Sequence, residues 1–137
     1  MANSPFHLPA SSRPCYLFEA NGEHIFRFHA LSTQTGGSYS VMETVSPQRS
    51  GPPPHTHDGS EEFFLLLDGN VVFIVDGQQF DVEPGDSLHI PRGVVHEFTV
   101  LTPSARMLAM YSPGGPEAAF IEYGTLVESE GGEPAGP

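Results

Sequence analysis

The chain of 137 residues contains no lysine, no tryptophan and a single cysteine, Cys15. Without lysine, mechanisms that depend on a lysine Schiff base or a lysine general base are excluded. One cysteine permits no disulfide bond within the chain and no cluster of thiolate metal ligands.

Positive charge is also scarce. Five arginines stand against 17 Asp and Glu residues, which gives a formal net charge of −12. A surface this acidic repels phosphate backbones and anionic lipids, so nucleic acids and membranes are poor partners. No stretch approaches the roughly 18 apolar residues of a membrane span, and the N-terminus lacks the basic start and apolar run of a signal peptide. We therefore expect a soluble, cytoplasmic protein.

Glycine (15 residues) and proline (14 residues) are abundant, together with many Val and Phe residues. This composition favours short strands joined by tight turns. An Asp-Gly pair at 76–77 between two apolar runs predicts a hairpin. Because turn signals recur about every 8–12 residues, we predict an all-β fold, an antiparallel barrel. Its expected strands are residues 24–30, 38–45, 62–67, 71–75, 78–82, 87–90, 95–101 and 106–111.

The remaining segments define the expected domain limits. Residues 1–14 are read as an irregular N-terminal arm, 15–127 as the barrel domain, and 128–137 as a flexible acidic tail. Residues 116–123 are predicted to form one short C-terminal helix, with Pro116 near its start and a glycine after its end. Residues 46–54 are a proline-rich connector, which argues against a central strand there.

Two histidines, His55 and His57, follow three consecutive prolines. In an extended chain, residues two apart point to the same face, so both imidazoles aim at one point. The prolines restrict the backbone to that extended form. Glu62 begins the next expected strand, where its carboxylate can complete one side of a coordination sphere.

A second segment strengthens this hypothesis. Pro91 and Gly93 bend the chain before His96 enters another strand, from which its ring could approach the same ion. Imidazole and carboxylate ligands together suit a divalent transition metal, and they leave Fe, Mn, Ni, Co, Cu and Zn all open.

The first segment resembles the first signature motif of the cupin superfamily. That motif reads Gly, His-x-His, three or four residues, Glu, six residues, Gly, and it is matched here by His55, His57, Glu62 and Gly69. Glu61 also satisfies the looser spacing to the histidines. The six-residue spacing to Gly69 favours Glu62, and neighbouring strand residues face opposite ways, so only one of the two can be a ligand.

The second segment resembles the second cupin motif through Gly85, Pro91, Gly93 and His96, while Val100 occupies the position of the motif's final Asn. This resemblance implies a double-stranded β-helix, or jelly roll. In cupins the histidines and the glutamate of these motifs bind the metal at the centre of the barrel. The implied ligands are His55, His57, Glu62 and His96.

Within the cupins, the prolines before His55 and the Tyr-Ser-Pro-Gly-Gly segment at 111–115 resemble the quercetin-dioxygenase-like subgroup. This implies a metal-dependent, dioxygenase-like oxygenase acting on a small aromatic or enolic molecule, with dioxygen as co-substrate. Glu62 would then act as both ligand and catalytic base. Two alternatives stay open: a non-oxidative metal-dependent cyclase, isomerase or decarboxylase, and a non-catalytic small-molecule-binding cupin.

Apolar side chains at alternate strand positions must fill the barrel, and some must line a cavity beside the metal. We expect Met42, Phe64 and Phe98 to contact a substrate. Small cupins commonly pair through edge strands, so we also expect a homodimer, with residues 5–20 crossing to the partner. The large apolar residues expected to lie mostly in the core are Phe26, Phe28, Phe64, Phe73, Phe80, Phe98, Met42, Met107 and Met110.

Overall fold

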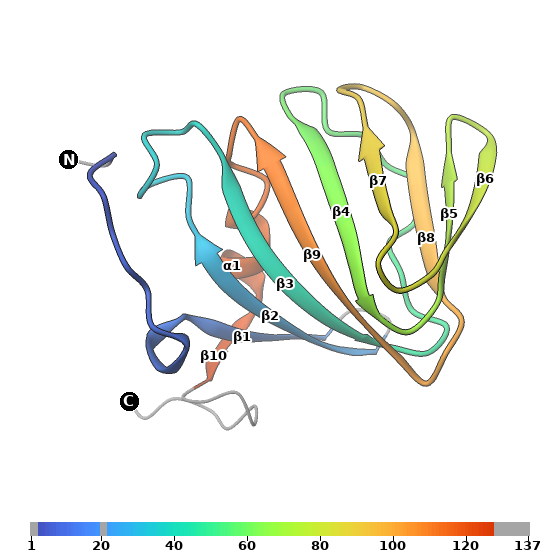
Figure 1. Ribbon diagram of the computed structural model, residues 1–137, viewed down its shortest axis with the longest axis horizontal. Helices are drawn as coiled ribbons and strands as arrows, with labels where there is room; N and C mark the ends of the chain where they lie inside the picture. The colour runs from blue at the N-terminus through green and yellow to red at the C-terminus, as the bar shows by residue number, and fades with distance from the viewer. Residues whose placement is uncertain (1–2, 20–21, 128–137) are drawn as a thin grey trace.

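The computed structural model describes residues 3–19 and 22–127, and their regular structure is almost entirely β-strand (Figure 1). No helix in these residues has the length and apolar character needed to cross a bilayer. A 3-10 turn, η1 (Ala10–Ser12), precedes the strands, and one helix, α1 (Ala118–Tyr123), precedes the last of them. The strands are β1 (Cys15–Glu19), β2 (Glu23–Ala30), β3 (Ser40–Pro47), β4 (Glu61–Asp68), β5 (Val71–Val75), β6 (Gln78–Val82), β7 (Ser87–Ile90), β8 (His96–Val100), β9 (Ser104–Ser112) and β10 (Thr125–Val127).

The strands form two antiparallel sheets. One has the order β10-β1-β2-β3-β9-β4-β7 and the other the order β6-β5-β8. The sheets pack through aromatic rings: the centroid of Phe64 in β4 lies 5.1 Å from that of Phe73 in β5 and 6.3 Å from that of Phe98 in β8. The predicted all-β cupin-type fold is confirmed.

The hairpin between β5 and β6 forms where the Asp-Gly pair predicts it. Asp76 and Gly77 both have positive φ, 51° and 77°, which matches the two-residue turns that suit the twist of paired strands. The strands pair residue for residue from Val71 with Val82 to Val75 with Gln78. This tight hairpin fixes the register of the smaller sheet, of which β8 is the other neighbour.

Four expectations about the fold need correction or qualification. The strand expected to end at residue 45 continues through Ser46 and Pro47, which pair with β9, so the connector starts later than predicted. Strands β1 and β10 were not predicted. Since β1 pairs with β2 and β10 of its own chain, residues 15–19 of the expected crossing arm belong to this sheet. Met110 was placed in the core but is 38% exposed on the outer face.

The limits of the domain, including the arm at 1–14, stay predictions, as does the homodimer. The acidic tail at 128–137 lies outside the described residues.

Helix α1 lies on the far side of β2 and β3 in Figure 1, against the inner face of the large sheet. Phe120 of α1 packs against Phe26 at 4.6 Å and against Phe18 at 5.5 Å between ring centroids. The buried residue Glu117 anchors its start: one carboxylate oxygen accepts a hydrogen bond from the Ser32 amide and the other from the Gly115 amide, each at 2.8 Å. The carboxylate thus connects the helix to the loop between β2 and β3.

Replacing Glu117 with glutamine should lower the free energy of unfolding by about 1–3 kcal/mol, because the amide nitrogen would face a buried N–H group. Burial alone would raise the pKa of Glu117, but the hydrogen bonds that the carboxylate accepts, that from the Ser32 amide foremost, outweigh burial and lower that pKa. The wild-type contribution is therefore complete above the ordinary glutamate pKa of about 4.3, and it is lost as pH falls through the lower native pKa. Urea unfolding at pH 7 and below pH 4 measures both effects.

The matched control for this substitution is Glu122→Gln, on the exposed face of the same helix. Its unfolding midpoint should stay at the wild-type value. Equal losses in both variants would show that the helix responds to net charge and not to the buried carboxylate of Glu117.

Candidate metal centre

Two histidines from distant parts of the chain are held side by side by their own backbones. The His55 amide donates to the His96 carbonyl at 3.0 Å, and the His96 amide donates to the His55 carbonyl at 2.9 Å. The Gly93 amide also bonds the His57 carbonyl at 3.1 Å. As a result, the ring centroid of His55 lies 4.2 Å from that of His96 and 4.9 Å from that of His57.

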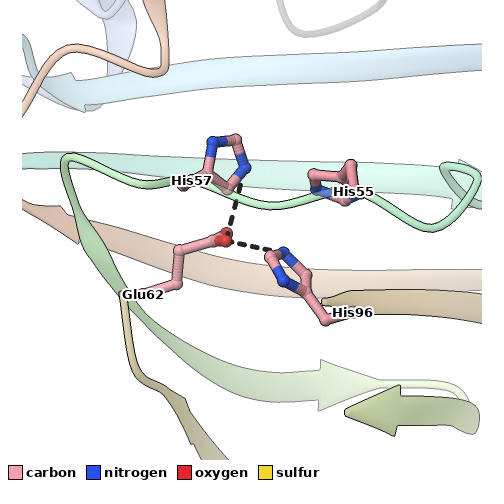
Figure 2. A group of neighbouring side chains, drawn as sticks. All are labelled: His55, His57, Glu62 and His96. Carbon is pink, nitrogen blue, oxygen red and sulfur yellow. Dashed lines mark ion pairs between the residues drawn. The ribbon is translucent and has the colours of Figure 1, made fainter. Parts of the chain in front are cut away.

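Glu62 reaches the same point from the large sheet (Figure 2). It lies near the start of β4, between Ile90 of β7 and Tyr111 of β9. Its carboxylate oxygen Oε1 is 2.8 Å from Nε2 of His96 and 3.4 Å from Nε2 of His57. The neighbouring Glu61 is exposed, as strand alternation requires.

The four side chains expected as ligands are thus brought together by the structure. One possible ligand atom from each lies within 4.8 Å of all the others. They come from three places in the fold: the proline-rich segment before β4, the start of β4 and the start of β8. The residues in this cluster are His55, His57, Glu62 and His96.

Two of the imidazoles are oriented through their other ring nitrogen. Nδ1 of His55 lies 2.8 Å from the Pro53 carbonyl, and Nδ1 of His96 lies 2.9 Å from the Val94 carbonyl. Because a carbonyl oxygen only accepts, each Nδ1 must carry a hydrogen, so in the neutral ring the lone pair is on Nε2. Metal-binding histidines are oriented in this way by carbonyl or carboxylate partners.

The buried atoms at the centre of the cluster fit a cation. Oε1 of Glu62 and Nε2 of His96 are both buried, and within the described residues neither has a hydrogen-bond partner, although they lie 2.8 Å apart. Two buried electron-pair donors left in this way are destabilising unless a proton or a metal ion lies between them.

The charges in the cluster depend on burial and on Glu62. Burial lowers the pKa of His57 and outweighs the attraction of the Glu62 carboxylate, so His57 favours the neutral form that can bind metal. For His96, burial lowers the pKa, but contacts with Glu62 and the Val94 carbonyl outweigh it and raise the pKa. Burial and the nearby Glu62 raise the pKa of Tyr111 well above its usual value, so its phenol stays protonated.

The cluster lies in the wall of a cavity of about 430 Å³. The three expected substrate contacts, Met42, Phe64 and Phe98, also line this cavity. They surround it with apolar surface, and the ring centroids of Phe64 and Phe98 are 6.3 Å apart. Their role toward a substrate stays a prediction.

Three polar residues that line the cavity, His24, Thr44 and Ser46, were not among the expected substrate contacts. The signal that could have found two of them is alternation along β3. If Met42 faces the interior, then residues 44 and 46 face it too, and both are buried in β3. In contrast, His89 is exposed on β7 and lies outside the cluster.

Three imidazoles and one carboxylate can bind a divalent metal from Mn²⁺ to Zn²⁺. Such an ion could act as a Lewis acid toward a substrate oxygen or support redox chemistry. The donors present therefore fit the cofactor expected from the motifs, and they leave its identity open.

Comparison with known proteins identifies the family. A family model described as the cupin domain matches residues 41–112. Quercetin 2,3-dioxygenase from Bacillus subtilis is 29% identical over 107 residues, which cover 78% of this chain and 32% of that protein. The chain spans about a third of the length of the curated relatives it matches first, a second quercetin 2,3-dioxygenase from Aspergillus japonicus included.

Solved structures show the same fold. A predicted oxalate decarboxylase from Thermotoga maritima superposes with a TM-score of 0.69 at 19% identity, covering 79% of this chain and 99% of that one. The polyketide cyclase RemF from Streptomyces resistomycificus gives a TM-score of 0.66 at 22% identity, covering 82% of each chain. Since the family model covers more than half of the chain and the fold agrees, this protein belongs to the cupin family.

Proposed function

We propose that the protein binds one divalent transition metal through His55, His57, Glu62 and His96, and uses it as an oxygenase on a small aromatic or enolic molecule. The observation that carries this proposal is the convergence of four electron-pair donors within 4.8 Å of one another, with the buried atoms Oε1 of Glu62 and Nε2 of His96 only 2.8 Å apart. The similarity to quercetin 2,3-dioxygenases favours the oxygenase over other metal-dependent chemistries.

A redox-active metal bound there would supply the Lewis acidity and the electron exchange that reaction of an enolate with dioxygen requires. Both oxygen atoms of dioxygen would enter the substrate, so the reaction needs no external reductant. Glu62 would take the proton of the substrate hydroxyl on a carboxylate oxygen, which makes the substrate a better electron donor. The rings of Phe64 and Phe98 would hold a flat substrate and exclude water around it.

The phenol of Tyr111 would orient the Glu62 carboxylate. Tyr111 pairs with Glu62 across β4 and β9, is 3% exposed and remains protonated at neutral pH. A protonated phenol can donate a hydrogen bond to the carboxylate, but it does not act as a base toward the substrate. Glu62 would then stay the base of the site.

Oxygen uptake by metal-loaded protein tests the oxygenase directly. Samples loaded separately with Fe²⁺, Mn²⁺, Co²⁺, Ni²⁺, Cu²⁺ or Zn²⁺ are mixed with the flavonol quercetin in an oxygen-electrode cell. We expect one dioxygen consumed for each quercetin lost with at least one redox-active metal. Zn²⁺-loaded protein should consume no dioxygen, because Zn²⁺ cannot change its oxidation state.

Two other results would contradict the oxygenase. Conversion of an enolic or polyketide-like substrate under anaerobic conditions would indicate a cyclase, isomerase or decarboxylase that uses the same Glu62 for proton transfer. Tight binding of such molecules by every metal-loaded form, with neither oxygen uptake nor product, would indicate a small-molecule-binding cupin.

A further inference from the structure

The cavity has a second polar region in addition to the metal cluster. Thr44 and Ser46 of β3 and His24 of β2 line the same cavity as the cluster. Nδ1 of His24 lies 2.8 Å from the Ser46 hydroxyl, and the His24 ring stacks on Phe26 with centroids 6.0 Å apart. The rest of the wall is largely apolar, so these groups are conspicuous as places where a ligand oxygen could bind.

The strand register separates this region from the cluster. Across the large sheet, Glu62 pairs with Tyr111, which in turn pairs with Ser40 of β3. Leu66 of β4 pairs with Met107, which in turn pairs with Thr44. Thr44 therefore lies four residues along β3 from the level of the cluster, or about 13 Å at the usual rise per strand residue.

Thr44 is the member of this region that lacks a partner. The residue is 6% exposed, and within the described part of the chain its Oγ1 is buried without a hydrogen-bond partner. A buried hydroxyl left in this state is destabilising, and natural proteins rarely keep one without a reason. Valine would fill nearly the same volume without that disadvantage. Thr44 lines the cavity, and a rotation about its χ1 exchanges the places of its hydroxyl and methyl groups, so a ligand oxygen in the cavity can complete this hydroxyl.

We propose that Thr44 binds a second oxygen of the ligand, so that the cavity selects an elongated molecule of about two linked aromatic rings with an oxygen at each end. One oxygen lies at the cluster, as the proposed function requires, and the other exchanges a hydrogen bond with Thr44 Oγ1. The hydroxyl can donate or accept, so a phenol or a carbonyl fits equally. The apolar wall between the ends holds the rings.

The test compares two probes that differ by one terminal hydroxyl, 4,4′-dihydroxybiphenyl and 4-phenylphenol. Calorimetric titration of Zn²⁺-loaded protein gives their dissociation constants without turnover. Wild type should bind the dihydroxy probe about tenfold more tightly, the effect of one hydrogen bond to a buried hydroxyl. In Thr44→Val this preference should fall to about one, while the affinity for 4-phenylphenol is unchanged.

Thr99→Val is the matched control, since Thr99 is a residue of β8 that does not line the cavity. It should keep the tenfold preference. Urea unfolding supplies a second measurement: Thr44→Val should be as stable as wild type or more stable, because it removes an unsatisfied hydroxyl. A preference that survives in Thr44→Val, or that Thr99→Val also removes, would overturn the proposal.

The same variants separate this inference from the proposed function. If the protein took up no metal, the proposed oxygenase would fail. Metal-free protein could still be titrated with 4-phenylphenol and with unsubstituted biphenyl. If Thr44 binds a ligand oxygen, wild type should bind 4-phenylphenol more tightly than biphenyl, and Thr44→Val should reduce this difference. An equal difference in both proteins would reject Thr44 as the residue that binds the oxygen.

Discussion

His57→Ala is expected to lower the affinity for a divalent transition metal by roughly a hundredfold or more, since even residues that only orient metal ligands contribute ten- to hundredfold. The substitution removes one imidazole donor and leaves the other three in place. The side chain is 27% exposed, so its loss should disturb the fold little. Elemental analysis after dialysis should fall from about one metal per chain toward none, and oxygen uptake should fall with it.

The control for this substitution is His89→Ala. His89 lies within the second cupin motif, between Gly85 and His96, but it is exposed on β7 and stands outside the cluster. Its metal content should equal that of wild type. Full metal content in His57→Ala, with tight binding retained in competition against a chelator, would contradict the assigned ligand set.

Gly51→Ala should be strongly destabilising, because among the described glycines an added methyl group meets its shortest contact here. A methyl group there would lie 1.8 Å from the Phe98 carbonyl oxygen, and the residue has a φ of +151°, which side chains rarely adopt. The segment cannot move away freely, because the Arg49 amide bonds the Val100 carbonyl and the Val100 amide bonds the Ser50 carbonyl. We expect a loss of roughly 3 kcal/mol in the free energy of unfolding, from overpacking and backbone strain together.

Metal binding should suffer as well, because the displaced segment leads directly to His55. The matched control is Gly59→Ala, where an added methyl group meets no atom within 4 Å. Thermal unfolding and metal titration of both variants measure the two effects. Wild-type behaviour of Gly51→Ala would mean that the proline-rich segment does not lie against β8 as described.

Much of the fold follows from period-two alternation and turn chemistry. The strands at 71–75, 78–82 and 87–90 have the predicted bounds, because Asp-Gly and Pro-Gly turns mark their ends. Strands β1 and β10 carry no such signal: they are short, and each is stabilised mainly by pairing with a distant segment. Met110 was misplaced because Met107 and Met110 are three residues apart, which on a strand puts them on opposite faces.

The site was predictable to a different degree. Local spacing alone brings His55 and His57 to one face. Alternation along the strand puts Glu61 and Glu62 on opposite faces, so only one of them can be a ligand. That His96 joins them depended on the resemblance to the cupin motifs, since the backbone bridge between His55 and His96 is a contact across 41 positions of sequence. Thr44 was missed because an unsatisfied hydroxyl is a property of three-dimensional packing, and the residue type alone does not reveal it.

The cluster draws its donors from both layers of the sandwich: Glu62 from the seven-stranded sheet through β4, and His96 from the three-stranded sheet through β8. An ion bound by both residues would link the two sheets to each other. Its binding free energy would then add to the stability of the folded chain. We therefore expect the cavity between the two sheets to be more rigid in metal-loaded protein than in metal-free protein.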